Sequence, residues 1–243
     1  MRIELINTGS ELLIGHVLNT HQQWIGRELN DQGWEVARQV TVADTGYAIE
    51  SAVRGGLSRS DLVITTGGLG PTADDITRDH IAALLGRELH ENTSVRDHIT
   101  AFFDRIRRPM PESVFAQARV PEGAQILRNI HGTAPGLFFE LCPNLYGEGQ
   151  APGWLLMLPG PPRELCPMFT EQVLPLLLEK CPPPVRMITR TLRAAGIGES
   201  MVEEKISGLL QYLTGAGLEI GYCARNGEVD VRLRAADPAI IDE

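Results

Sequence analysis

DLVITTGGLGPTADDIT, residues 61–77, is the stretch of sequence that decides the fold of this chain. Its first five residues predict a strand that is apolar on both faces, as parallel strands buried inside a sheet are. A glycine-rich turn follows, and a helix begins after the turn. This order is typical of an α/β domain that binds a ligand outside the carboxyl end of a strand.

Outward from this stretch, strands and helices alternate along the chain. Hydrophobic spacing predicts strands at residues 2–8, 34–41, 61–65, 136–141 and 154–158. It predicts helices at about residues 20–33, 45–57, 77–86, 92–107 and 162–179. The last two strands read as an antiparallel hairpin. We therefore expect an α/β fold, a three-layer α/β/α arrangement around a mostly parallel mixed sheet with right-handed crossovers.

A second, smaller domain is predicted after a run of three prolines, Pro182, Pro183 and Pro184, which read as a semi-rigid spacer. We place the domains at residues 1–178 and 185–243. The second begins with a strand at 185–192 and a helix at 199–210. Two strands follow at 218–223 and 228–234, joined by an Asn-Gly turn that is a strong hairpin signal. The predicted class of this domain is α+β.

Composition narrows the classes of function. The chain has 243 residues, and its net charge of −9 disfavours binding of a nucleic-acid backbone. No stretch of eighteen apolar residues predicts a membrane helix, and the N-terminus lacks the features of a secretory signal. We expect a cytoplasmic protein that binds neither nucleic acid nor membrane. The spacing of the four cysteines favours neither a zinc site nor a disulfide framework.

The glycine-rich loop is the predicted ligand site. Its glycines allow the backbone to approach a ligand closely, its proline stiffens the turn, and the following helix N-terminus favours an anion. Carboxylates beside a phosphate require a divalent cation between them or a role as bases. Asp74 and Asp75 are therefore candidate metal ligands, although Asp75 or Thr77 is also expected to cap the next helix. The loop residues predicted to bind substrate are Gly67, Gly68, Gly70, Pro71, Thr72 and Thr77.

Segments after other strands should reach the same edge of the sheet. Gly9 and Glu11 follow the first strand, and Glu11 is either a ligand-binding carboxylate or a solvated loop residue. Asp44 follows the second strand and is either a metal-binding or basic residue or a helix cap. Pro159 and Gly160 follow the strand at 154–158 and either contact the ligand or form a structural turn. A nicotinamide dinucleotide site is disfavoured because the glycines follow the third strand and no acid-tipped strand comes next.

The loop TGGLGPTADDIT, residues 66–77, resembles that of the CinA (competence/damage-inducible protein A) family, whose first domain has the molybdopterin-binding MoaB/Mog fold. Similar motifs are GSELLIG at 9–15, NIHGTAPG at 129–136, LPGPPRE at 158–164 and GIGES at 196–200. The family usually has Asn where His21 stands. Family members often carry a further deamidase domain, which these residues do not match.

The resemblance implies several properties of the chain. The first domain would hydrolyse the diphosphate of ADP-ribose to AMP and ribose 5-phosphate, with a divalent cation of the Mg²⁺, Co²⁺ or Mn²⁺ type and with K⁺. A KH-like domain would follow, and the chain would form a homodimer. Asp75 and Asp44 match the family's acids and become the expected catalytic and metal-binding residues, with Asp74 as a further metal ligand. Gly132 and Thr133, in the NIHGTAPG motif, are expected to contact the substrate.

Three hypotheses about function follow. The first is an ADP-ribose pyrophosphatase, a metal-dependent hydrolase. The second is a molybdopterin-binding protein of the MoaB/Mog type, in which the same loop holds the phosphate of a pterin. The third is a non-catalytic nucleotide-binding module of a larger CinA-like protein. The first is the leading prediction.

Overall fold

The computed structural model describes residues 1–147, 151–183 and 185–243. These residues form two compact units, Met1–Gly26 with Glu35–Pro182 and Arg27–Trp34 with Pro183–Glu243. Pro184, the last proline of the predicted spacer, lies outside the described residues, as does part of the hairpin connection at 148–150. Each unit is described by itself.

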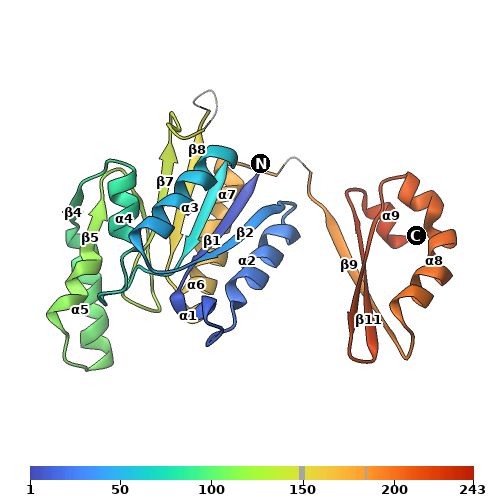
Figure 1. Cartoon of the computed structure of the whole chain (residues 1–243), viewed down its shortest axis with the longest axis horizontal. Coiled ribbons are helices and arrows are strands. Elements are labelled where there is room, and N and C mark those ends of the chain that lie inside the picture. The colour runs from blue at the N-terminus through green and yellow to red at the C-terminus, as the bar shows by residue number, and fades with distance from the viewer. Residues whose placement is uncertain (148–150, 184) are drawn as a thin grey trace. The chain divides into compact units, whose positions relative to one another are not determined.

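A six-stranded sheet in the order β2-β1-β3-β8-β7-β6 is the centre of the first unit (Figure 1). Its strands are β1 (Ile3–Thr8), β2 (Val36–Val42), β3 (Leu62–Thr66), β6 (Gln125–Leu127), β7 (Gly136–Leu141) and β8 (Gly153–Leu158). The first four strands of the order pair in parallel, whereas β7 pairs antiparallel with both β8 and β6. The predicted mostly parallel mixed sheet is confirmed.

Helices cover both faces of this sheet. They are α1 (Ser10–Leu13), α2 (Thr20–Asp31), α3 (Gly46–Arg59), α4 (Thr77–Leu84), α5 (Thr93–Ile106), α6 (Pro162–Met168) and α7 (Leu174–Lys180). A π-helical turn, η3 (Phe169–Val173), joins α6 to α7. Pro167 and Pro175 have no N–H to donate, which interrupts the single helix predicted here.

The core explains why the elements lie in three layers. On one face of the sheet, Ile6 of β1 and Met157 of β8 belong to one buried cluster with Val53 of α3 and Ile99 of α5. On the other face, Trp24 of α2 packs edge-on against Phe169 of η3, with ring centroids 5.5 Å apart. The apolar strands predicted from the sequence are thus covered on both sides, as a parallel sheet requires.

The segment between α4 and β6, called the insertion below, contains two short strands that were not predicted. It contains β4 (Leu89–Glu91) and β5 (Arg119–Pro121), which pair antiparallel, and the 3-10 helix η1 (Glu112–Ala118). Strands of three residues are too short to show a hydrophobic period. This insertion supplies one residue of the pocket described below.

The second unit contains β9 (Ile188–Ala195), α8 (Glu199–Gly215), β10 (Glu219–Arg225), β11 (Glu228–Ala235) and α9 (Pro238–Asp242). Its antiparallel sheet has the order β10-β11-β9. The β10–β11 connection turns at Gly227, whose φ of 77° explains the Asn-Gly signal. The predicted α+β class of this unit is confirmed. Among the residues that the structure describes, no helix is long and apolar enough to cross a membrane.

Candidate functional site

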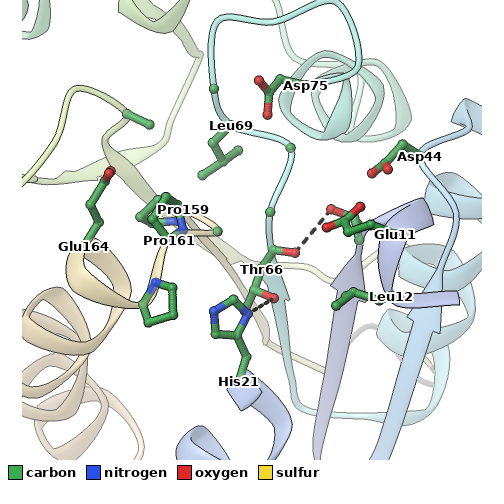
Figure 2. A pocket seen from close by; sticks show the side chains of 18 of the residues that line it. Glu11, Leu12, His21, Asp44, Thr66, Leu69, Asp75, Pro159, Pro161 and Glu164 are labelled. Atoms are coloured by element: carbon green, nitrogen blue, oxygen red, sulfur yellow. Dashed lines mark hydrogen bonds between the residues drawn. The ribbon is translucent and has the colours of Figure 1, made fainter. Parts of the chain in front are cut away.

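The loops that follow β1, β3 and β8 meet at one end of the sheet, because these strands are parallel neighbours. They surround a pocket of about 500 Å³ (Figure 2). A volume of this size is typical of small-molecule sites, which usually range from about 300 to 1,000 Å³. The predicted site residues that line it are Gly9, Glu11, Asp44, Gly67, Gly68, Gly70, Pro71, Asp74, Asp75, Thr133, Pro159 and Gly160.

Three predicted residues, Thr72, Thr77 and Gly132, do not line the pocket. Thr77 is fully buried, and its hydroxyl lies 3.2 Å from that of Thr8. Thr72 faces Asp75, and Gly132 packs beneath Glu164, whose carboxylate occupies the space that a Cβ at position 132 would need. These residues therefore shape the pocket without lining it.

The glycine-rich loop takes a backbone course that side chains disfavour. Gly67 and Gly68 have φ of 96° and 66°, and a Cβ at position 68 would collide with the hydroxyl of Thr77. The N–H of Gly67 donates to the carbonyl of Leu158 at 3.0 Å, and the N–H of Thr77 donates to the carbonyl of Gly68 at 3.1 Å. The loop is thus held closely between β8 and the start of α4.

Asp75 does not cap α4, contrary to one of the expectations from sequence, and neither does Thr77. The N-cap of that helix is Ile76, which makes no side-chain capping bond. The carboxylate of Asp75 turns back instead and accepts hydrogen bonds from the N–H of Thr72, at 3.0 Å, and from the Thr72 hydroxyl. The start of α4 therefore has no side-chain cap, although its first N–H is taken by the Gly68 carbonyl, and the Asp75 carboxylate is held at the pocket.

Asp74 is the exposed neighbour of Asp75 on the same turn. The nearby Thr72 side chain, followed by the backbone of Asp74 itself, lowers the pKa of the Asp74 carboxyl. The turn therefore presents negative charge beside the uncapped helix end, where carboxylates are favoured.

Asp44 joins the loops after β1 and β2. Its carboxylate accepts from the N–H of Ser10 at 2.7 Å, and its own N–H donates to the Ser10 hydroxyl at 3.1 Å. The cap of α3 is Thr45, whose hydroxyl accepts from the N–H of Ala48. The alternative that Asp44 is a helix cap is therefore wrong, and its carboxylate lies across the pocket mouth near Glu11 (Figure 2).

A largely buried polar chain lies beneath the loop, and most of it was not predicted from the sequence. Asn7 donates to the hydroxyl of Thr66 at 2.6 Å, and that hydroxyl lies 3.5 Å from Nδ1 of His21 (Figure 2). Burial lowers the pKa of His21, and the Gly160 backbone partly opposes this effect. His21 therefore faces the pocket as a neutral imidazole at neutral pH.

Two further pocket residues, Gln117 and Glu164, are buried and were not predicted. Gln117 comes from η1, and its side-chain amide donates to the carbonyl of Leu69 at 3.4 Å. No spacing signal in the sequence connects it to the loop. Glu164 begins α6 and lies in the LPGPPRE motif, so the resemblance was a signal that could have found it.

The carboxylates of the pocket do not form a closed metal site by themselves. Among residues 1–147, 151–183 and 185–243, no group of three or more His, Cys, Asp or Glu side chains is placed to hold a metal ion. A Mg²⁺-type ion often takes only one or two protein carboxylates and completes its shell with water and ligand phosphate. Asp44 and Asp75 both line the pocket.

Comparison with known proteins agrees with the two-unit architecture. Residues 4–179 match the family described as "Probable molybdopterin binding domain". Residues 189–241 match the "Damage-inducible protein CinA KH domain".

The individual relatives described next carry the CinA name. A CinA-like protein of Akkermansia muciniphila is 43% identical over 240 residues, which is 99% of this chain and 55% of the relative. The crystal structure of CinA from Thermoplasma acidophilum, a protein of unknown function, matches with a TM-score of 0.61 and 28% identity. It covers 72% of this chain and 97% of its own. The chain spans about half the length of the curated relatives that it matches.

These findings overturn the leading prediction of a hydrolase. The family that covers the pocket is described as binding molybdopterin, and neither relative is named as acting on ADP-ribose. The prediction of an ADP-ribose pyrophosphatase is therefore wrong. The physical reason is that a glycine-rich loop beside an uncapped helix recognises a phosphate, which a pterin phosphate and a nucleotide share.

Proposed function

The chain belongs to the CinA family, with a molybdopterin-binding domain followed by a CinA KH domain, and on that premise we propose that its pocket binds a molybdopterin-type ligand. Such a ligand is a pterin ring that carries a phosphate. The pocket of about 500 Å³ is wide enough for one such molecule. The proposal concerns binding at this pocket only.

The observation that carries the proposal is the glycine-rich loop at the uncapped start of α4. Ile76 makes no side-chain capping bond, so the first N–H groups of the helix have no side-chain cap, and the helix dipole adds positive potential there. Gly68 and Gly70 have no side chains to keep a phosphate away. We place the ligand's phosphate at this point.

A divalent cation of the Mg²⁺, Co²⁺ or Mn²⁺ type fits beside that phosphate. Asp75 and Asp44 would hold it, since each carboxylate is already oriented by a hydrogen bond from Thr72 or Ser10. When bound, the ion neutralises charge between phosphate and carboxylates. The K⁺ dependence and the homodimer implied by the resemblance stay predictions.

Binding of neopterin phosphate, measured by calorimetry with and without Mg²⁺, tests the proposal. We expect saturable binding that weakens when EDTA removes the metal, and much weaker binding of unphosphorylated neopterin. The Gly70→Val variant should not bind, because a side chain at position 70 meets the Asp75 carboxylate in the loop. Equal binding of phosphorylated and unphosphorylated neopterin would contradict the proposed phosphate site.

We propose further that the second unit is not a nucleic-acid surface. Two of its arginines, Arg193 and Arg225, pair with the single carboxylate of Asp230 at 2.8 and 2.6 Å, and Arg234 pairs with Glu219 at 3.2 Å. Paired arginines offer less charge to phosphates than free ones. Fluorescence anisotropy with labelled single-stranded RNA should show no saturable binding at 150 mM salt.

A further inference from the structure

Glu164 is a buried carboxylate that faces the pocket. It lies in the first turn of α6, its side chain is 9% exposed, and it lines the pocket with Pro161 and Thr133. Burial of a carboxylate is costly unless hydrogen bonds compensate for the water that it loses. The partners of Glu164 therefore show how the side chain is held.

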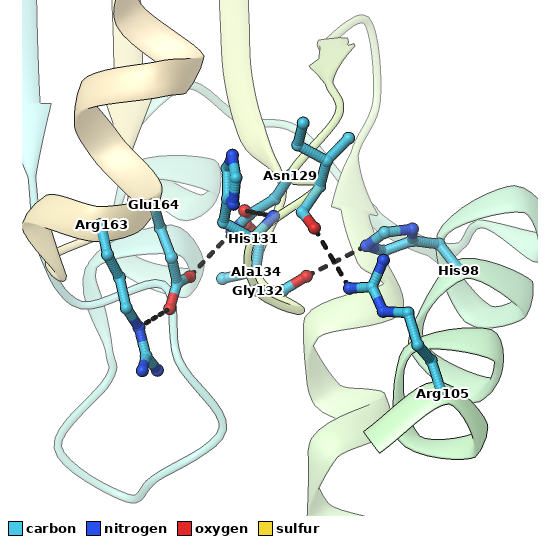
Figure 3. A network of polar contacts seen from close by, with 9 residues as sticks. His98, Arg105, Asn129, His131, Gly132, Ala134, Arg163 and Glu164 are labelled. Carbon is cyan, nitrogen blue, oxygen red and sulfur yellow. Dashed lines mark hydrogen bonds and ion pairs between the residues drawn. The ribbon is translucent and has the colours of Figure 1, made fainter. Parts of the chain in front are cut away.

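Asn129 fixes one of the two carboxylate oxygens (Figure 3). Its Nδ2 donates to Glu164 Oε2 at 2.8 Å and also to the carbonyl of Ala134 at 2.8 Å. Its Oδ1 accepts from the N–H of His131 at 3.1 Å. Because every polar group of the Asn129 side chain is used, the position of Oε2 is set by a rigid network.

The loop that carries this network is supported from α5. His98 Nε2 lies 3.0 Å from the carbonyl of Gly132, and Arg105 donates to the carbonyl of Ile130 at 3.2 Å (Figure 3). A side chain at position 132 would occupy the place of the Glu164 carboxylate. Glycine at this position is thus explained by the carboxylate above it.

The second oxygen, Oε1, has a different environment. Its nearest charged partner is Nε of Arg163 at 3.6 Å, and the Arg163 side chain is 80% exposed. An exposed ion pair of that length contributes little to stability, so Glu164 can readily exchange Arg163 for another partner. Oε1 is therefore available to a donor inside the pocket.

We propose that Glu164 determines specificity by accepting hydrogen bonds from the amino-pyrimidinone edge of the ligand ring. A pterin presents a ring N–H and an exocyclic amino group side by side, and two parallel N–H donors match a carboxylate. Guanine presents the same pair of donors, whereas adenine does not. The inference rests on the proposed function, since it names how that pocket reads the pterin.

The arrangement of the pocket supports this orientation of the ligand. Glu164 lies on the other side of Leu69 and Pro159 from Asp44 and Glu11 (Figure 2). The phosphate and its cation would lie beside the loop at Asp75. The Glu164 carboxylate has no cation beside it in this arrangement and would repel a phosphate. The neutral end of the ligand, the ring edge, is left to face Glu164.

Titration with two matched pairs of ligands tests the inference. The first pair is neopterin phosphate against inorganic phosphate, and the second is GMP against AMP. We expect the wild type to prefer neopterin phosphate and GMP. Glu164→Gln replaces the carboxylate with an amide. It should weaken the binding of neopterin phosphate and of GMP by about 10- to 100-fold, as loss of a charged hydrogen bond does. Its binding of inorganic phosphate and AMP should stay unchanged.

Three further variants complete the design. Glu171→Gln makes the same change at an exposed position of the next helical segment and should leave all affinities unchanged. Arg163→Gln should also preserve the preference, which separates ring recognition from the surface ion pair. Glu164→Asp, with its charge retained, should recover part of the preference and serves as the readout if Glu164→Gln fails to fold.

The outcomes separate the inference from the proposed function. If the wild type binds neopterin phosphate and Glu164→Gln keeps the same preference for it, the inference is overturned while the proposed function stands. Equal weakening of all four ligands shows a purely structural role for Glu164 and also overturns the inference. A wild type that binds neither neopterin phosphate nor GMP overturns both.

Discussion

The side-chain amide of Gln117 donates to the main-chain carbonyl of Leu69, at 3.4 Å, across 48 positions of the chain. Gln117 is 2% exposed, and among the described residues its own carbonyl oxygen has no hydrogen-bond partner. The insertion thus holds the glycine-rich loop from below.

Gln117→Met tests this support. The variant keeps the side chain's size and removes its polar atoms, including the unpartnered carbonyl, so the free energy of unfolding should change by less than about 1 kcal/mol. Affinity for neopterin phosphate should fall by about 2- to 12-fold, the value of one neutral hydrogen bond. Urea unfolding and calorimetry measure the two quantities. Unchanged affinity would show that the loop holds its shape without Gln117.

Asp75→Asn should separate metal-assisted binding from binding to the loop alone. The amide oxygen still accepts the hydrogen bonds from Thr72, so the loop keeps its shape, but the charge that favours a cation is lost. We expect neopterin phosphate to bind at least about tenfold more weakly in Mg²⁺, and to bind like the wild type in EDTA. Asp104→Asn, at an exposed position of α5, is the matched control. An identical Mg²⁺ effect in Asp75→Asn and the wild type would exclude Asp75 as a metal ligand.

Gly68→Ala and Gly86→Ala form a matched pair for stability. Both glycines have left-handed backbone conformations, with φ of 66° and 65°. An alanine at 86 meets nothing within 4 Å, whereas an alanine at 68 collides with Thr77. Gly86→Ala should cost about 1 to 2 kcal/mol of unfolding free energy, and Gly68→Ala about 2 kcal/mol more. Equal costs in thermal and urea unfolding would contradict the collision.

The buried carboxylate of Glu4 provides a stability prediction away from the pocket. Glu4 is fully buried in β1 and accepts from Nε and Nη2 of Arg59 at 2.9 and 2.6 Å. Arg59→Met should lower the unfolding free energy by about 2 to 3 kcal/mol. This is no more than the smallest cost usual for breaking a buried ion pair, because the Arg59 side chain is partly exposed. Ligand affinity of the folded variant should be unchanged, since Glu4 begins β1 and the pocket lies at its other end. A loss below 0.5 kcal/mol, as is common for surface pairs, would contradict this prediction.

His21 should make the first unit less stable in mild acid. Burial holds the pKa of His21 in the folded chain below the ordinary value of about 6.5, so the unfolded chain takes up a proton first as the pH falls. The stability associated with neutral His21 is therefore complete above pH 6.5 and is lost as the pH falls towards the lower folded pKa.

Urea unfolding at pH 7.5 and 5.5 measures this effect. His21→Asn, which removes the titrating imidazole, should reduce the loss of stability between the two pH values. His16→Asn, at an exposed position, should leave the loss as it is in the wild type. The same pH dependence in His21→Asn and the wild type would show that another group titrates.

Much of the fold could be predicted because its signals are local. The predicted bounds of the strand at 61–65 and of the helix after the turn differ from those of β3 and α4 by no more than two residues. The hydrophobic period and the glycines mark these elements directly. The hairpin of β7 and β8 was also predicted, and its pairing is confirmed.

The site was predicted less completely because its inner residues are brought together by tertiary contacts. Gln117 lies in an insertion without a clear period, and His21 lies beside Thr66, 45 positions away in the sequence. The direction of Asp75 depends on Thr72 and on the space that Gly70 leaves, so capping preference alone was misleading. The sequence predicts a phosphate site at the loop, and a loop of this kind does not distinguish a nucleotide from a pterin.

The position of β8 beside β3 has a consequence for synthesis on the ribosome. Leu62 pairs with Trp154, so the loop after β3 leaves the ribosome long before its neighbouring strand. Until β8 is added, the N–H and C=O groups along one edge of β3 have no strand partner, and the wall at Pro159 and Gly160 does not exist. A ligand that needs this wall cannot therefore assist the early folding of the nascent chain, and a chain that stalls before Gly153 exposes an unpaired strand edge that is prone to aggregation.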